Sequence, residues 1–296
     1  MVSRIKNIFY FFIFLFLNIT AHNLTAKSGQ TVKVISLAPS NTLLINELHA
    51  QNVLIGISRF CQEFNKNPKS KVVGDFSSYN QEEIIKLKPD YILLVQGQER
   101  LQESLNKITL IPFKVVLLPN SQLKNISQNI IKIGTITNQQ TLAQNKAKLF
   151  DSALNELKSI LKNTNKPKVF FCIWCRPLIT PGKNSFLADI IDTCGGTNIG
   201  DSFNRDYAVI NSEFLIKQNP DFILLGKDIN VNDLITPDLK DYIKAFKLKQ
   251  VVNYPQNKYL DYPCLKTIKG MYYLALKLHP DLKDKLNKWY VKYSNF

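Results

Sequence analysis

The sequence has few of the residues on which common catalytic sites are built. Only three of its 296 residues are histidine: His22 lies beside an expected cleavage region, and His49 and His279 stand alone at expected helix ends. No Gly-x-Ser-x-Gly motif occurs, and Gly182-Lys183 lacks both the earlier glycine and the following Ser or Thr of a phosphate-binding loop. These absences argue against a histidine-based enzyme and a histidine-rich metal site. We therefore expect a protein that is not an enzyme, with no intrinsic cofactor and no metal ion of its own.

A hydrophobic run long enough to anchor the chain in a membrane is also missing. The apolar run Ile8–Leu17 is shorter than the about 18 to 20 residues that a membrane anchor needs. Arg4 and Lys6 precede it and small residues follow it, ending at Ala26, which is the layout of a cleavable signal peptide. No cysteine lies beside the cleavage region, so a lipid anchor is not expected. We predict that residues 1–26 are removed and that the mature protein is soluble in the periplasm.

Acidic residues are outnumbered, since 23 Asp and Glu stand against 38 Lys and Arg, which gives a formal charge of +15. Such a charge often indicates nucleic acid binding. Here the basic residues are mostly lysines scattered among helical patterns, without a motif that combines aromatic and basic residues. We therefore expect no nucleic acid partner, and we interpret the charge as solvated faces with a bias toward anionic ligands or membrane surfaces.

The five cysteines would face an oxidising compartment after export. They are Cys61, Cys172, Cys175, Cys194 and Cys264, and their odd number leaves at least one unpaired in a monomer. The Cys-x-x-Cys spacing of Cys172 and Cys175 is typical of redox or metal sites. No helix pattern follows that pair, and no second pair occurs. A secreted thiol-redox or metal-handling enzyme is therefore the less favoured alternative, and the disulfide pairing stays open.

Strand and helix patterns alternate along the mature chain, which predicts βα units and a mainly parallel sheet. The stretch Asn138–Lys162 interrupts the alternation with apolar residues at three- and four-residue intervals and no glycine or proline, which predicts one long helix. We expect two Rossmann-like α/β lobes, residues 27–137 and 164–296, joined by a rigid helix over residues 138–163. The ligand cleft should lie between the lobes.

An internal repeat supports two related lobes. Asn80–Leu94 and Asn211–Leu225 match at a constant offset, with identical Asn, Glu, Ile, Lys, Pro, Asp, Ile, Leu and Leu. Each copy predicts an asparagine-capped helix, a Pro-Asp turn and a buried strand. In the first copy Glu83 occupies the position of a capping box. A further N-cap is expected at Ser40-Asn41, before a helix that ends near Leu48.

Several phrases of the sequence are similar to the signatures of one protein family. They are Val34–Thr42 (VISLAPSNT), Glu83–Asp90 (EIIKLKPD), Cys194–Ile199 (CGGTNI), and Gly270 followed by His279-Pro280. Together they resemble the periplasmic cobalamin- and ferric-siderophore-binding proteins that supply ABC importers, over nearly all of the mature chain. The resemblance implies two α/β lobes bridged by one rigid helix, and a monomer that hands its ligand to permease subunits. It also implies that Glu82 and Glu213, equivalent members of the repeat, dock with permease arginines.

The resemblance also implies positions in the ligand cleft. Phe60, Phe76 and Tyr207 fall where cobalamin-binding members carry aromatic residues, and Trp174 is a further candidate wall. Val95 stands where an aromatic residue is expected, which weakens the cobalamin assignment.

Cations that could hold an anionic chelate are expected at Arg59, Arg176 and Lys266, although Lys266 replaces an arginine of the family and loses its bidentate geometry. Cobalamin is slightly favoured as the ligand. A ferric siderophore or haem is the alternative.

Overall fold

The structure is a computed structural model that describes residues 31–227, 229–234, 237–253 and 258–295. Two expectations lie outside the described residues: the signal peptide over residues 1–26, and the end, at Tyr254, of the strand that the sequence predicts over Val251–Tyr254. Among the described helices, none combines the length and the apolar character that crossing a membrane requires.

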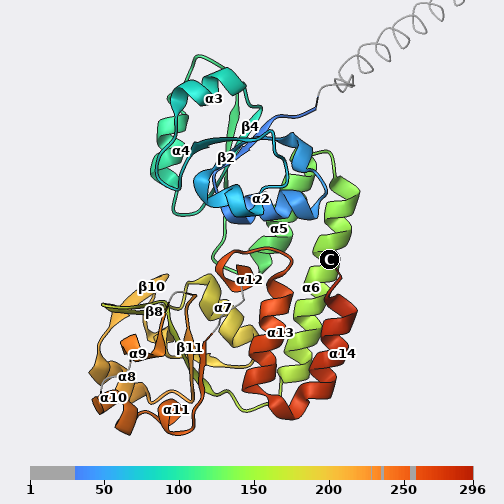
Figure 1. The fold of residues 1–296 in the computed structure, drawn as a ribbon. Coiled ribbons are helices and arrows are strands. Elements are labelled where there is room, and N and C mark those ends of the chain that lie inside the picture. Colours follow the sequence, from blue (N-terminus) through green and yellow to red (C-terminus); the bar gives the residue numbers. More distant parts are fainter. Residues whose placement is uncertain (1–30, 228, 235–236, 254–257, 296) are drawn as a thin grey trace, which may run out of the picture. The chain divides into compact units, whose positions relative to one another are not determined.

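The first half of the described chain, which we name the N-terminal lobe, folds around a five-stranded parallel sheet (Figure 1). The strand order is β3-β2-β1-β4-β5, with β1 Val34–Ser36, β2 Leu54–Ser58, β3 Lys71–Gly74, β4 Tyr91–Val95 and β5 Lys114–Leu118. The helices are α2 Pro39–Glu47, α3 Gln81–Leu87, α4 Glu99–Leu105 and α5 Lys124–Ile136. Ile92, Leu93 and Leu94 are all fully buried, the pattern of a parallel strand covered on both faces. The expected alternation is confirmed.

The second half, the C-terminal lobe, contains a four-stranded parallel sheet in the order β12-β11-β6-β9. Its strands are β6 Lys168–Cys172, β9 Thr197–Asn198, β11 Phe222–Leu225 and β12 Val251–Asn253. Its helices are α7 Phe186–Thr193, α8 Ser212–Gln218, α9 Val231–Leu234, α10 Pro237–Tyr242, α11 Lys244–Lys247, α12 Lys258–Asp261, α13 Thr267–Leu278 and α14 Lys283–Tyr293.

The C-terminal lobe also has an antiparallel sheet that the sequence analysis did not predict. Its order is β10-β8-β7, with β7 Trp174–Cys175, β8 Leu178–Pro181 and β10 Tyr207–Ile210. These strands are only two to four residues long, so each shows too little alternation to be recognised. β7 and β8 form a hairpin that starts directly after β6.

The predicted long helix is α6, Gln140–Leu161, with 22 residues. It begins two residues later than expected because Asn138 adopts a left-handed conformation (φ 58°), which turns the chain sharply after α5. α6 packs on α5 and α14, and in Figure 1 it runs beside both. Trp289 of α14 donates a hydrogen bond from Nε1 to the Ala153 carbonyl oxygen (2.8 Å).

Small residues set how closely α5 and α6 approach each other. A Cβ on Gly134 of α5 would lie 2.3 Å from the Ala143 Cβ, so the two helices approach each other through Gly134, Ala143 and Ala147. Most of the predicted apolar stripe is buried, including Phe150, Leu154 and Leu157, whereas Leu149 is 37% exposed.

The internal repeat adopts the same local structure in both lobes. Asn80 Oδ1 accepts from the Glu83 N–H (3.1 Å) at the start of α3, and Asn211 Oδ1 accepts from the Phe214 N–H (2.8 Å) at the start of α8. The two helices end at the left-handed residues Lys88 and Asn219.

The aspartate of each repeat then joins the turn to the middle of its sheet. Asp90 Oδ2 accepts from the Lys33 N–H just before β1, and Asp221 Oδ2 accepts from the Lys168 N–H at the start of β6, both at 2.8 Å. The asparagine and the aspartate that both copies of the repeat share therefore make the same hydrogen bonds in each lobe. This explains why the two copies have the same residue at these positions.

One predicted helix start and one predicted capping box need correction. α2 begins at Pro39, with Ala38 as its N-cap, because proline suits the first turn of a helix. Asn41 is instead buried, and its Nδ2 donates to the Leu94 carbonyl oxygen (3.1 Å). Glu83 forms ion pairs with lysines rather than closing a capping box, since the Asn80 N–H already donates to the Val73 carbonyl oxygen (2.7 Å).

The paired caps give a direct test. Asn80→Ala and Asn211→Ala should each lower the free energy of unfolding by about 1 kcal/mol, because each removes the acceptor of one helical N–H. Denaturant titration would measure the change. Asn80→Ser and Asn211→Ser are the controls, since serine keeps an acceptor and should recover most of the loss. Equal losses for alanine and serine would contradict the cap assignment.

Candidate ligand-binding site

The predicted ligand-binding residues lie mostly where parallel strands end. Arg59 and Phe60 open the 3-10 helix Arg59–Phe64 directly after β2, Phe76 follows β3, and Trp174 follows β6. In open α/β sheets ligands bind outside the carboxyl ends of the strands. The topology therefore places these side chains at the edges where a ligand is expected.

In the N-terminal lobe the structure brings two predicted residues, Arg59 and Phe60, together and ties them to the residue before Phe76. The Arg59 guanidinium lies 4.9 Å from the centre of the Phe60 ring, and Arg59 Nη2 lies 3.6 Å from Asp75 Oδ2. Asp75 immediately precedes Phe76, so the ion pair links the loops after β2 and β3. Hydrogen bonds from the Ser77 and Ser78 segment lower the pKa of Asp75, which keeps its carboxylate charged. Phe60 is 49% exposed and Phe76 is 44% exposed.

Two residues that the sequence analysis missed hold these loops. Gln98 is buried, and its Nε2 donates to the carbonyl oxygens of Phe76 (2.8 Å) and Leu37 (3.3 Å). Cys61 is fully buried, with Sγ 3.1 Å from Ser58 Oγ. Burial of Cys61 turns the neighbouring Phe60 outward. A lone glutamine after a strand gives no sequence signal, because its partners come from loops distant along the chain.

In the C-terminal lobe the predicted residues Trp174 and Arg176 share one short segment. Trp174 is 54% exposed, and its Nε1 donates to the Arg176 carbonyl oxygen (2.9 Å). Trp174 pairs with Ile179 across the β7–β8 hairpin, so the backbone below the indole is held by a sheet. Arg176 is exposed, and its guanidinium forms no ion pair with any residue the structure describes.

Tyr207 lines a cavity of about 230 Å³ that both lobes form. Asn120 and Ser121 follow β5 of the N-terminal lobe, and the C-terminal lobe supplies the other lining residues, among them Ile173 next to Trp174. The cavity therefore lies at the carboxyl ends of β5 and β6, with Tyr207 in its lining.

Lys266 is exposed just before α13, with Nζ 5.7 Å from the centre of the Tyr259 ring. The preceding residue, Leu265, donates its N–H to Glu47 Oε2 of α2 (3.2 Å), a contact between the lobes that the sequence did not reveal. The described contacts of Lys266 are therefore with Tyr259 and Glu47 and not with the predicted aromatic residues.

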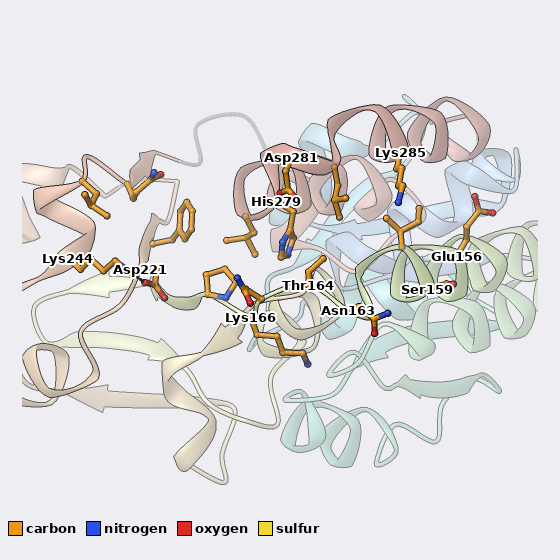
Figure 2. A pocket seen from close by; sticks show the side chains of 18 residues that line it. Glu156, Ser159, Asn163, Thr164, Lys166, Asp221, Lys244, His279, Asp281 and Lys285 are labelled. Carbon is orange, nitrogen blue, oxygen red and sulfur yellow. Dashed lines mark hydrogen bonds and ion pairs between the residues drawn. The ribbon is translucent and has the colours of Figure 1, made fainter.

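A second hollow, of about 990 Å³, lies at the other ends of the strands of the C-terminal parallel sheet (Figure 2). Lys166 precedes β6 and Asp221 precedes β11, so this hollow is at the amino ends of the strands. Asp221 is paired with Lys244 (2.6 Å), and Lys166 with Asp192 (3.1 Å). These charges already satisfy one another. The hollow shares none of the predicted ligand-binding residues, and we do not assign the ligand to it.

The two predicted docking carboxylates occupy equivalent places in the repeat. Glu82 is in the first turn of α3 and Glu213 is in the first turn of α8, and both are exposed. Neither forms an ion pair within the described part of the chain, whereas the neighbouring Glu83 pairs with Lys71 and Lys86. Each lobe therefore presents an exposed carboxylate, two residues after the asparagine that caps its helix, that forms no ion pair with the described residues.

The five thiols are unbridged in the structure, and Cys172 and Cys175 are 3.4 Å apart between their Sγ atoms. Among the described residues, no group of three or more His, Cys, Asp or Glu side chains is placed to hold a metal ion.

Comparison with known proteins identifies a family. A family model described as periplasmic binding protein matches residues 34–257. A vitamin B12-binding protein of Vibrio vulnificus is 27% identical over 225 residues, which cover 76% of this chain and 82% of that protein.

Two solved structures share the fold. The crystal structure of the periplasmic vitamin B12-binding protein BtuF of Vibrio cholerae matches with a TM-score of 0.73 at 20% identity, over 85% of this chain and 98% of that one. The periplasmic heme-binding protein RhuT of Roseiflexus sp. RS-1 matches with a TM-score of 0.69 at 16% identity, over 85% and 99%. The two-lobed α/β fold expected from the sequence is the fold of these proteins.

Proposed function

This chain belongs to the periplasmic binding protein family, and we propose that it captures a bulky metal chelate, a corrinoid such as cobalamin, and delivers it to the permease of an ABC importer. Binding is then its whole chemistry, with the metal ion brought by the ligand. The protein works in the periplasm as a monomer after its signal peptide is removed.

The observation that carries this proposal is the exposure of four large aromatic side chains at the predicted cleft positions. Phe60, Phe76, Trp174 and Tyr207 are between 44% and 58% exposed. Large rings on a surface leave apolar area in water, which a bulky planar ligand would cover with little loss of side-chain entropy. They come from both lobes, so one ligand held between the lobes could contact all four.

The charges favour a corrinoid over an anionic siderophore. Arg59, the cation nearest the N-terminal aromatic group, is already paired with Asp75. A carboxylate in that place competes with an anionic chelate for the guanidinium. The names of the curated relatives, vitamin B12-binding proteins, point the same way. Val95, where an aromatic residue was expected, is buried and supplies no wall to the cleft.

A ferric siderophore or haem is the alternative ligand, and Arg176 is the feature that favours an anionic one. Among the described residues, no histidine is evident as a ligand for the iron of haem. Of the histidines in the described residues, His49 is at the end of α2, and His279 is buried with Nε2 3.2 Å from the Cys194 carbonyl oxygen. His279 also borders the hollow at the amino ends of the strands.

Titration with cyanocobalamin and a panel of ferric siderophores tests the proposal. We expect cyanocobalamin to bind and to quench tryptophan fluorescence, and Phe60→Ala and Trp174→Ala each to weaken binding by about tenfold, because loss of an aromatic anchor costs about 1.4 kcal/mol. Isothermal calorimetry would measure the affinities. Tyr242→Ala is the matched control, since Tyr242 is 63% exposed on α10 and lies outside the predicted site.

Three outcomes would decide against the proposal or its details. If no chelate binds, transport of a chelate is excluded. If only siderophores bind, the ligand class is wrong while the transport function stands. If Tyr242→Ala weakens binding as much as Trp174→Ala, the site is misplaced.

A further inference from the structure

The pair Cys172 and Cys175 is not explained by ligand capture. Cys172 ends β6 and is fully buried, whereas Cys175 lies in β7 and is only half-buried. Their Sγ atoms are 3.4 Å apart, and Cys172 Sγ is also 3.4 Å from the Trp174 carbonyl oxygen. Trp174, which carries the exposed indole, therefore lies between the two cysteines in the chain.

The fold creates this contact and keeps it. The Ile173 N–H donates to the Ile179 carbonyl oxygen (2.9 Å), which folds the chain back immediately after β6. Cys175 then pairs with Leu178 across the hairpin, so its side chain returns toward the end of β6. Cys172 and Cys175 also pack in the same apolar cluster of the C-terminal lobe. The remaining cysteines, Cys61, Cys194 and Cys264, are buried, and no contact between any of their sulfurs and another cysteine sulfur is found among the described residues.

We propose that Cys172 and Cys175 form a reversible dithiol–disulfide pair that sets the position of the ligand-facing segment Trp174–Arg176. A disulfide needs the two sulfurs at about 2.05 Å, so oxidation draws them together from 3.4 Å. The disulfide would bridge the short segment that contains Trp174. It would also remove the contact between the Cys172 S–H and the Trp174 carbonyl oxygen. The backbone that carries the indole and the guanidinium must adjust.

The chemistry requires a disulfide as oxidant, either a small molecule such as oxidised glutathione or a protein disulfide of the exported compartment. The Cys175 thiolate attacks one sulfur of that disulfide and releases the first thiolate. Cys172 then loses its proton and attacks Cys175 Sγ, which releases the second thiolate. One disulfide forms in the protein, and the oxidant is reduced to two thiols.

For Cys175 to attack first, it must be more accessible than Cys172, and the environments of the two thiols differ in this way. Cys175 is reached by a reagent in solution because it is only half-buried. Burial and the neighbouring Cys175 raise the pKa of Cys172 well above its usual range, so it is unreactive toward outside reagents and acts after Cys175.

The expected effect of the disulfide on ligand affinity rests on the proposed function. A segment restrained by a bond loses less conformational entropy when a ligand binds, so the oxidised protein should bind more tightly. We expect the dissociation constant for cyanocobalamin to be about three- to tenfold lower in the oxidised form.

Peptide mapping of the full chain tests the disulfide itself. Trypsin should release Val169–Lys183 as one peptide that contains Cys172 and Cys175 and no other cysteine, because a proline follows Arg176. After equilibration with oxidised glutathione and alkylation under denaturing conditions, we expect this peptide to lose two hydrogen atoms and carry no alkyl group. Two alkyl groups at every glutathione ratio, or a stable glutathione adduct, would overturn the proposal.

Fluorescence tests the coupling without a ligand. Trp174 and Trp289 are the two tryptophans of the sequence, and Trp289 is buried. Acrylamide should quench the reduced and oxidised proteins differently, and the difference should vanish in Trp174→Phe and in Cys175→Ser. An identical difference in Trp174→Phe would show that the indole is not the reporter, and no difference in the wild type would remove the coupling.

The outcomes separate this inference from the proposed function. If cyanocobalamin binds neither form while the disulfide and the quenching difference are found, the ligand assignment fails and the redox pair stands. If cyanocobalamin binds but no disulfide forms, the pair fails and the function stands. Cys175→Ser is preferred over a change at the buried Cys172, and Cys172→Ala serves as the second variant if Cys175→Ser does not fold.

Discussion

Replacing both Glu82 and Glu213 with alanine is expected to abolish ligand uptake while ligand affinity stays unchanged. Both carboxylates are exposed in the first turn of equivalent helices, and neither is paired within the described residues. Removing one partner of a charge pair buried in an interface costs about 2 kcal/mol or more, so each single variant should lower uptake about 30-fold or more. Uptake of labelled cyanocobalamin by cells with the cognate permease would measure the effect.

A control with the same change in charge makes this test specific. Glu103 of α4 and Asp241 of α10 are exposed acids, one in each lobe, and Glu103→Ala/Asp241→Ala raises the net charge by the same amount. We expect near-normal uptake from this control. Affinity should be measured for all variants, because a fall in affinity would place Glu82 or Glu213 in the ligand site instead of the docking surface.

The second large effect concerns Glu47 and the dependence of stability on pH. Glu47 is 8% exposed at the end of α2, and its Oε1 has no hydrogen-bond partner among the described residues. Burial raises its pKa from 4.5 to about 7, despite hydrogen bonds from the Leu265 and Lys266 backbone and attraction to Lys266 and Lys146. Folding therefore favours the protonated carboxyl group.

The direction in which stability changes with pH follows from proton binding. Between pH 4.5 and about 7 the folded state holds more protons than the unfolded state, so stability should fall as pH rises through this window. The full difference corresponds to about 3 kcal/mol. Glu47→Gln should remove this component, so that the variant gains stability relative to the wild type above pH 7 and differs little at pH 4.5. Denaturant titrations from pH 4.5 to 8 would measure the difference.

Glu156→Gln provides a contrast of opposite sign. Hydrogen bonds from Lys292 lower the pKa of Glu156, so the stability from this pair is present at neutral pH and is lost as pH falls. Comparing variants cancels the titration of other groups such as His279. A Glu47→Gln difference that is constant with pH would refute the buried-carboxyl assignment.

Local signals made much of the fold predictable. Each copy of the repeat forms the predicted capped helix and buried strand, α3 and β4 in one lobe and α8 and β11 in the other, because buried apolar runs, asparagine caps and Pro-Asp turns act within a few residues. The repeat was recognisable for the same reason. The site residues themselves stay predictions, but the loops that carry Phe60, Phe76 and Trp174 could be placed after strands from the chain order alone.

Features made by contacts between distant segments were not predictable. Gln98 joins loops after β1 and β3, and Glu47 joins α2 to the segment before α13. The antiparallel hairpin that brings Cys172 to Cys175 is too short to show a period. The partners of Gln98 and Glu47 are far away in the sequence, so no local pattern records them, and the Cys-x-x-Cys spacing alone does not show how close the two thiols lie.

The sequence by itself determined that each lobe contains the same capped helix, turn and central strand, because hydrogen bonds within each unit need only neighbouring residues. Only the tertiary structure decided how closely α5 and α6 approach, which carboxyl group is deprived of water, and how near to each other the two thiols of the Cys-x-x-Cys pair lie. These depend on how closely backbones approach and how much solvent is excluded, and both are set by packing between secondary-structure elements, which the order of neighbouring residues does not specify.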